Sequence, residues 1–313
     1  MTDGNWERSA LEQLARDSLD ERRRARRWGI LFKGLAFGLL LAGLLSTLVV
    51  IGSRERLCLD RCTALVEVRG ELDASGRASA ERVIAGLQAA FKNGGTKGVV
   101  VRVNSPGGSP VQAGQIYDEM RRLRAAYPDI PLYVVVDEIA ASGGYYVASA
   151  GDRIYVDKAS IIGSIGVIME GFGFTGAMDK IGVERRVVTA GENKSFLDPF
   201  EPVDPMQRAY VQQMLDDIHQ QFIAAVKDGR GARLKDEPGM FSGLVWNGKR
   251  AVDLGLADGL GSLDSVARDI VKAEEIVDFT PEDNLAERVA RKFGATMAGE
   301  LGLKLRSAIP GWR

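Results

Sequence analysis

The sequence predicts an α/β domain with a largely parallel sheet, preceded by one transmembrane helix. Short apolar runs alternate with amphipathic helical segments through residues 63–275, as expected of successive βαβ units. Upstream, Ile30 to Ile51 carries a single charge, Lys33, near one end. At about 1.5 Å per residue this run reaches roughly 33 Å as a helix, which is enough to cross a bilayer core.

Each expected element has a local reason. Val99 to Val103 is a continuous apolar run, typical of a strand buried on both faces. Val83, Leu87 and Phe91 share one helical face, and Gly94 follows that helix as a stop signal. The expected strands are 65–68, 99–103, 132–136, 153–156, 165–169 and 183–189. The expected helices are 79–92, 110–126, 145–150, 205–226, 251–256 and 263–273.

The charges around the apolar run predict its orientation. Five arginines lie within residues 22–27, before the run, and three lie within residues 54–61, after it. This asymmetry leaves the N-terminus in the cytoplasm and the bulk of the chain outside it. A cleaved signal peptide is the competing interpretation, but the run is longer than a usual signal core and no small-x-small cleavage site follows. We therefore expect a single-pass protein of the inner (cytoplasmic) membrane.

These features divide the chain into five expected parts. They are a cytoplasmic segment 1–28, a transmembrane helix 29–52, a juxtamembrane linker 53–62, a catalytic domain 63–275 and a C-terminal helical tail 276–313. In the tail, apolar residues recur every four positions from Leu285 to Leu305. That pattern predicts a helix packed on its own domain, on a neighbouring copy or on the membrane surface.

Composition excludes some classes of function. The net charge is −1, and no basic stripe with interleaved aromatic residues is present, so nucleic-acid binding has little support. Two cysteines and one histidine do not build a usual zinc site without carboxylate help. Cys58 and Cys62 lie just beyond the membrane, either as a short-loop disulfide or as free thiols; the sequence leaves both open.

One serine stands at a position suited to a nucleophile. Ser142 follows an apolar strand and precedes two glycines and a small-residue helix, in the stretch Ala140-Ala-Ser-Gly-Gly-Tyr-Tyr. Such a turn pushes a hydroxyl out of the sheet, and the helix N-terminus behind it offers free N–H groups. A second glycine turn, Asn104-Ser-Pro-Gly-Gly, also follows a buried strand. Its N–H groups are candidates for stabilising an oxyanion.

A serine hydroxyl needs a base. His219 is the single histidine, but it lies beside the apolar face of an expected helix, where a surface or boundary role is the simpler interpretation. A lysine kept neutral by its surroundings is the alternative. The best candidate is Lys194, in Gly191-Glu-Asn-Lys-Ser, after an expected strand.

At this point the motifs resemble a known family. Ser142-Gly-Gly-Tyr-Tyr, Asn104-Ser-Pro-Gly-Gly, Gly163-Ser-Ile-Gly-Val and Gly191-x-x-Lys-Ser are similar, in order and spacing, to the serine–lysine peptidases of the signal peptide peptidase A family. The resemblance covers about two-thirds of the chain and is to the short, single-repeat form. It implies a crotonase-like or Clp-protease-like arrangement of stacked βαβ units.

The resemblance also implies roles for the residues. Ser142 would be the nucleophile, Lys194 the general base and Ser164 the residue that orients the lysine amine. The backbone N–H groups of Gly143 and Gly108 would form the oxyanion hole. No cofactor or metal is expected. The implied substrates are remnant signal peptides or other membrane-proximal polypeptides, and the implied assembly is a homo-oligomer whose active sites use neighbouring subunits.

Two alternatives remain open. One is a non-catalytic membrane scaffold on the same fold that binds peptides. The other is an acyl-CoA-type enzyme, since the wider superfamily includes crotonases; Asp137 and Glu138, close to the serine turn, would then be an acid–base pair. Polar residues that merely close a strand are the simpler interpretation of these two carboxylates.

Overall fold

A computed structural model describes residues 26–44, 58–235 and 237–281. The chain divides into two units, Met1–Glu55 and Arg56–Arg313. In the first unit the described residues form one exposed helix, Arg26–Leu44, which is long and apolar enough to cross a membrane by length and composition. Most of the expected N-terminal segment 1–28, the end of the span 29–52 and nearly all of the tail 276–313 lie outside the described residues.

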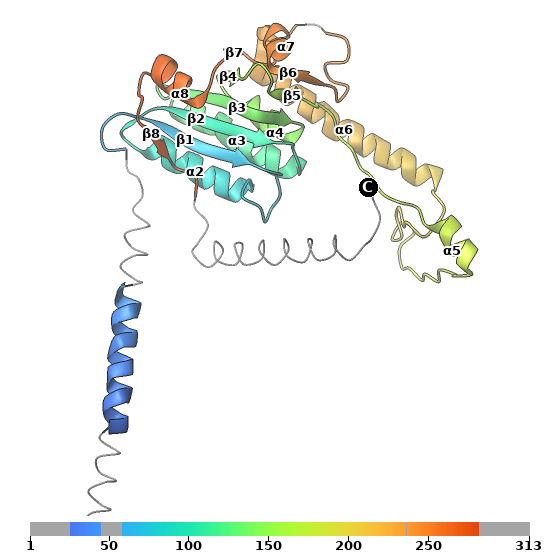
Figure 1. The fold of residues 1–313 in the computed structure, drawn as a ribbon. Helices are drawn as coiled ribbons and strands as arrows, with labels where there is room; N and C mark the ends of the chain where they lie inside the picture. Colours follow the sequence, from blue (N-terminus) through green and yellow to red (C-terminus); the bar gives the residue numbers. More distant parts are fainter. Residues whose placement is uncertain (1–25, 45–57, 236, 282–313) are drawn as a thin grey trace, which may run out of the picture. The chain divides into compact units, whose positions relative to one another are not determined.

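The second unit is built on a mixed sheet, as the alternating pattern predicted (Figure 1). Its spatial order is β6-β5-β3-β2-β1-β8, with β4 pairing to β3 and β7 pairing to β4. All of these pairs are parallel except β5 with β6. The strands are β1 Cys62–Arg69, β2 Thr96–Ser105, β3 Leu132–Ala141, β4 Arg153–Val156, β5 Ile161–Gly163, β6 Val245–Asn247, β7 Gly259–Leu260 and β8 Ile276–Asp278. Strand β8 occupies the three residues beyond residue 275, where the expected catalytic domain ends.

Helices cover one face of this sheet and form the main core with it (Figure 1). Alternate residues of β2 show the two sides: Val99, Val101 and Val103 face the main core, whereas Val100 lies in a smaller cluster on the other face. The helices are α2 Ala80–Lys92, α3 Pro110–Ala126, α4 Gly143–Ala148, α5 Thr175–Ile181, α6 Pro205–Arg230, α7 Gly248–Asp253 and α8 Leu263–Ser265, with a 3-10 turn at Gly231–Arg233 and a π-helical turn at Val266–Val271.

Two expected strands, 165–169 and 183–189, are not strands. Residues 166–174 and 182–204 are irregular, and α5, which the pattern did not predict, lies between them. The apolar residues of these segments suggested strands, but no strand among the described residues pairs with their backbone. We call residues 166–214 the arm. In Figure 1 α5 lies at the end of α6 that is far from the sheet.

The arm exposes an unusual amount of apolar surface. Val188 is 99% exposed and Phe172 is 82% exposed, and no residue of α5 is buried. The arm packs chiefly on itself: Phe174 stacks on Phe200 with ring centroids 5.4 Å apart. Large apolar side chains that gather on an exposed surface mark an interaction site in soluble domains.

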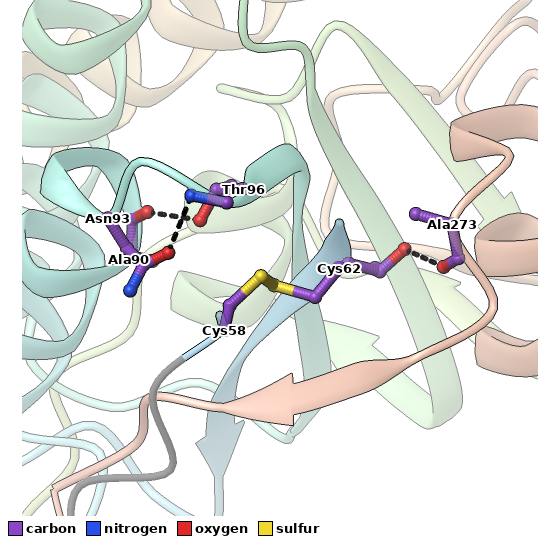
Figure 2. The surroundings of a disulfide bond; sticks show 8 residues. Cys58, Cys62, Ala90, Asn93, Thr96 and Ala273 are labelled. Carbon is purple, nitrogen blue, oxygen red and sulfur yellow. Dashed lines mark hydrogen bonds between the residues drawn. A yellow bond between two sulfur atoms is a disulfide. The ribbon is translucent and has the colours of Figure 1, made fainter. Parts of the chain in front are cut away.

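Cys58 and Cys62 form a disulfide, which resolves the question that the sequence left open (Figure 2). The bridge closes the turn that leads into β1, and both cysteines are buried. Next to it, the Thr63 hydroxyl donates to the carbonyl oxygen of Ala273 at 2.7 Å. The start of β1 is thus tied to the chain segment before β8.

Candidate active site

Ser142 stands between β3 and α4 in a backbone conformation that is rare for a residue with a side chain. Its φ is 50° and its ψ is −125°. A non-glycine residue costs about 1–3 kcal/mol in such a region and stays there only when its surroundings hold it. One restraint is visible: the Ser142 N–H donates to the carbonyl oxygen of Gly163, at the end of β5, at 2.9 Å. The side chain is half-buried, so a short strand-to-helix turn presents its hydroxyl at the edge of the sheet.

The glycines around Ser142 are required by close backbone approach. A Cβ at Gly107 would lie 2.7 Å from Ser142 Cβ, and a Cβ at Gly144 would lie 2.6 Å from the carbonyl oxygen of Ser105. The two glycine turns, after β2 and after β3, are therefore packed directly against each other. Any side chain at either position would push the turns apart.

Two free N–H groups converge beside the serine. The backbone N–H of Gly108 and that of Gly143 donate to no protein acceptor within the described residues. The two N–H groups lie close together, as the space around the glycines shows. A Cβ added at Gly143 would lie 3.5 Å from the Gly108 nitrogen, and a Cβ added at Gly107 would lie 3.0 Å from the Gly143 nitrogen. Gly108 is exposed. A pair of unpaired N–H donors next to a hydroxyl is the arrangement that an oxyanion needs.

Leu72 holds the Gly107–Gly108 turn in place, a role that the sequence analysis missed. Its N–H donates to Gly107 O, and its carbonyl oxygen accepts from the N–H of Ser109, both at 2.8 Å. Its side chain is fully buried, with Cδ1 3.0 Å from where a Cβ at Gly143 would stand. A lone leucine after a strand carries no signal of this role, because only the crossing of residues 70–75 over the turn creates it.

Ser164 lies next to Ser142. Strands β3 and β5 pair in parallel with Ala141 opposite Gly163, so the two serines are the next residue on each strand. Ser164 also has a positive φ, 53°, and its N–H donates to Leu244 O at 2.7 Å. The structure thus brings together Ser142, Gly143, Gly108 and Ser164, four of the five residues singled out from the sequence.

Lys194 lies elsewhere, on the arm. It is exposed, in the loop between α5 and α6, and its N–H closes a turn onto Gly191 O at 3.1 Å. The same loop lies against the N-terminal end of α6, since the N–H of Leu197 donates to Gln207 Oε1 at 3.0 Å.

The length of α6 separates this loop from Ser142 within one chain. Phe222 stacks on Tyr146, one helical turn beyond Ser142, with ring centroids 4.9 Å apart. Gln207, beside the Lys194 loop, is about 22 Å from Phe222 along the axis at about 1.5 Å per residue. This helical length places the Lys194 loop well along α6 from the level of Tyr146, and the pairing of the Lys194 amine with the Ser142 hydroxyl stays a prediction.

The C-terminal end of α6 is fixed to the core by a buried ion pair. Arg230, fully buried, donates to Asp258 Oδ2 at 2.8 Å and to Gly255 O at 2.9 Å. Burial by itself would raise the pKa of Asp258, but the hydrogen bond and charge of Arg230, the Ile154 N–H and the charge of Arg233 together lower it. This pair sets the direction in which α6 leaves the core.

The other candidates from the sequence have structural partners. His219, on α6, lies 3.1 Å through Nε2 from the carbonyl oxygen of Ile165. Asp137 pairs with Arg69 at 3.7 Å and with Arg102 at 3.8 Å, on the sheet face opposite the main core. It therefore serves an ion-pair cluster.

Two protein-family models together match residues 63–277, which include nearly the whole sheet. Residues 125–277 match the model of peptidase family S49, and residues 63–164 match the model of Clp protease. Protease 4 of Haemophilus influenzae is 33% identical over 194 residues, which are 61% of this chain and 30% of that protein. The chloroplastic serine protease SPPA of Arabidopsis thaliana is 28% identical over 244 residues, 77% of this chain and 36% of that protein.

A further relative carries a different name. A protein of Brucella melitensis named Na+/H+ antiporter NhaA is 47% identical over 184 residues, which are 58% of this chain but 25% of that protein. The match covers only a quarter of that protein, so its name does not assign an activity to this chain. The chain spans well under two-thirds of the length of each of these three relatives.

Proposed function

The chain belongs to peptidase family S49, the signal peptide peptidase A family, and on that premise we propose that it is a membrane-anchored serine endopeptidase with a serine–lysine dyad. Ser142 is the nucleophile, Lys194 the general base, and Ser164 the residue that holds the lysine amine. The N–H groups of Gly143 and Gly108 bind the oxyanion. The substrates are extended polypeptides close to the membrane, with remnant signal peptides as the first candidates.

One observation carries the proposal: a strained serine stands beside two backbone N–H groups that have no acceptor among the described residues. Ser142 has a φ of 50° at the N-terminus of α4, where the Gly143 N–H is free and the Gly108 N–H lies alongside. A purely structural turn at this position has no need of a serine with positive φ, because glycine is the residue that adopts it without strain. Strain of this kind is common at reactive sites.

The proposed reaction is an acyl transfer in two steps. The uncharged Lys194 amine takes the proton of the Ser142 hydroxyl as its oxygen attacks the scissile carbonyl carbon. The N–H groups of Gly143 and Gly108 donate to the resulting oxyanion. The C–N bond then breaks, and the lysine returns the proton to the leaving amine. Water, deprotonated by the same amine, hydrolyses the acyl-enzyme and releases Ser142.

The position of Lys194 on the arm supports a dyad formed between copies. The Lys194 loop lies beside Gln207, about 22 Å along α6 from Phe222, which packs next to the Ser142 turn. The arm also exposes apolar side chains such as Phe172 and Val188. Burying this surface against a second chain would stabilise the assembly at about 25 cal/mol per Å² of apolar area. We propose that a homo-oligomer brings Lys194 of one copy to Ser142 and Ser164 of its neighbour.

The exposed helix Arg26–Leu44 supports membrane anchoring. The arginines before it favour a cytoplasmic N-terminus, and the Cys58–Cys62 disulfide is consistent with a catalytic domain in an oxidising space outside the cytoplasm. In this orientation the active site lies just outside the bilayer into which signal peptides partition.

The test uses the full chain in detergent and a synthetic signal peptide as substrate. The parent protein is compared with Ser142→Ala, Lys194→Ala and, as a matched control, Lys180→Ala, an exposed lysine of α5 on the same arm. We expect cleavage by the parent and by Lys180→Ala, and none by the other two variants. Equal cleavage by all four proteins would refute the proposal.

A further inference from the structure

His219 is the single histidine of the chain, and the proposed reaction leaves it without a role. Its Nε2 atom lies 3.1 Å from the carbonyl oxygen of Ile165, the residue directly after Ser164. A carbonyl oxygen only accepts hydrogen bonds, so Nε2 carries the proton and donates it. The ring is half-buried.

The residue lies at the point where α6 leaves the core. Toward the C-terminus, Phe222 is buried and stacks on Tyr146 of α4. Toward the N-terminus, Met214, Tyr210 and Met206 are exposed. His219 is thus where the helix that carries the arm meets the Ser164 turn.

The Ser164 turn is held by a small set of hydrogen bonds. The Ser164 N–H donates to Leu244 O at 2.7 Å, and the Gly243 N–H donates to Ile165 O at 3.1 Å. The His219 bond is a second one to that same Ile165 oxygen. With a φ of 53°, Ser164 needs such restraints, because a strained conformation persists only where the neighbouring contacts determine it.

We propose that His219 is a positioning residue, which fixes the direction of the Ser164 hydroxyl through its hydrogen bond to Ile165 O. This proposal rests on the proposed function, in which that hydroxyl holds the lysine amine. The effect on the reaction passes through Ser164.

The experiment compares two substitutions of different hydrogen-bonding ability in the full-length protein. His219→Gln keeps a side-chain N–H donor at a similar reach, whereas His219→Leu keeps the size and removes the donor. Both are made in the parent and in a Ser164→Ala background, and kcat and KM are measured on a synthetic signal peptide. Backbone hydrogen exchange at Ser164 and Gly243 is measured on the same proteins.

We expect His219→Leu to lower kcat about three- to tenfold with little change in KM, as for the loss of one hydrogen bond. His219→Gln should recover most of that loss. In the Ser164→Ala background His219→Leu should have no further effect, because residues that act as a unit are not additive. Exchange at Ser164 and Gly243 should be faster in His219→Leu and near the parent rate in His219→Gln.

Three results would overturn the inference. The first is an equal loss with Leu and Gln, and the second is a loss in the Ser164→Ala background as large as in the parent. The third is unchanged exchange at Ser164 and Gly243 in His219→Leu, which decides the matter even if the protein cleaves no peptide. Absent cleavage by the parent would count against the proposed function alone, so the two failures are distinguishable.

Discussion

Ser142 and Ser164 stand side by side at the ends of two paired parallel strands, both with positive φ. Strand β3 ends at Ala141 and β5 at Gly163, so each serine is the first residue after its strand. The Ser142 N–H still donates to the carbonyl oxygen of Gly163 at 2.9 Å. The values of φ are 50° and 53°. Two adjacent strained hydroxyl residues are costly in a turn that only connects elements. Their proximity is the feature on which the predicted chemistry depends.

Substitution of Gly108 tests the oxyanion hole. In Gly108→Ala the new Cβ would lie 2.4 Å from Leu72 O, at a φ of +136° that disfavours any side chain. The turn must move, and the Gly108 N–H moves with it, so we expect kcat/KM on a signal peptide to fall about 100-fold or more.

The control for this substitution is Gly114→Ala in α3, where no atom lies within 4 Å of the new Cβ. An alanine there should stabilise the helix by about 0.5–1 kcal/mol and leave activity unchanged. Urea unfolding of both variants separates lost activity from lost fold. Full activity of Gly108→Ala would exclude its N–H from the oxyanion hole.

Mixed oligomers test whether the dyad forms between copies. Ser142→Ala and Lys194→Ala chains are each expected to be inactive, but a 1:1 co-assembly creates sites with one intact serine and one intact lysine. For head-to-tail contacts with random mixing, about one quarter of the sites are complete. We therefore expect about one quarter of the parent activity, measured on co-expressed chains with different tags after tandem purification. A co-assembly without activity would indicate a dyad within one chain or no dyad.

The Arg230–Asp258 pair predicts a pH dependence of stability. The pKa of Asp258 is lowered in the folded protein, although burial opposes this, because Arg230 and its other partners favour the carboxylate. A lowered folded-state pKa contributes stability above the unfolded pKa, about 4, and this contribution is lost as the pH falls through the folded value.

The measurement is urea unfolding of the parent protein and Asp258→Asn between pH 7.5 and pH 3. At neutral pH the substitution leaves Arg230 buried without its charge partner, so we expect a loss of about 3 kcal/mol. The difference between the two proteins should shrink at the acidic end. Asp253→Asn, an exposed residue of α7, should show no such difference, and a constant Asp258→Asn deficit at all pH values would contradict the linkage.

The Cys58–Cys62 disulfide predicts a dependence on redox conditions. It closes a short loop at the start of β1, and loop-closure entropy for about five residues corresponds to roughly 2 kcal/mol. Reductant should lower the unfolding midpoint of the parent protein, and the double variant Cys58→Ser/Cys62→Ser should have that lower midpoint and no response to reductant. Free thiols trapped by alkylation in intact cells would contradict both the bridge and the predicted orientation.

Much of the fold was predictable because its signals are local. Val99 to Val103 is apolar throughout and forms part of β2, and the helix 110–126 was predicted with the bounds that α3 has. Strands β5, β6, β7 and β8 were missed because two or three residues carry no periodicity. The segments 165–169 and 183–189 were mistaken for strands because their apolar residues are typical of strands. Among the described residues, no strand pairs with either segment.

The sequence by itself determined the long apolar run near the N-terminus, the alternation of the main strands and helices, and the serine in a glycine-rich turn, since these depend on residue type and spacing. Only the tertiary structure decided that Ser142, Ser164, Gly108 and Gly143 meet at one sheet edge while Lys194 lies on an exposed arm. The reason is physical: a turn is specified by its own residues, but strand pairing and the path of α6 are set by contacts between segments far apart in the chain.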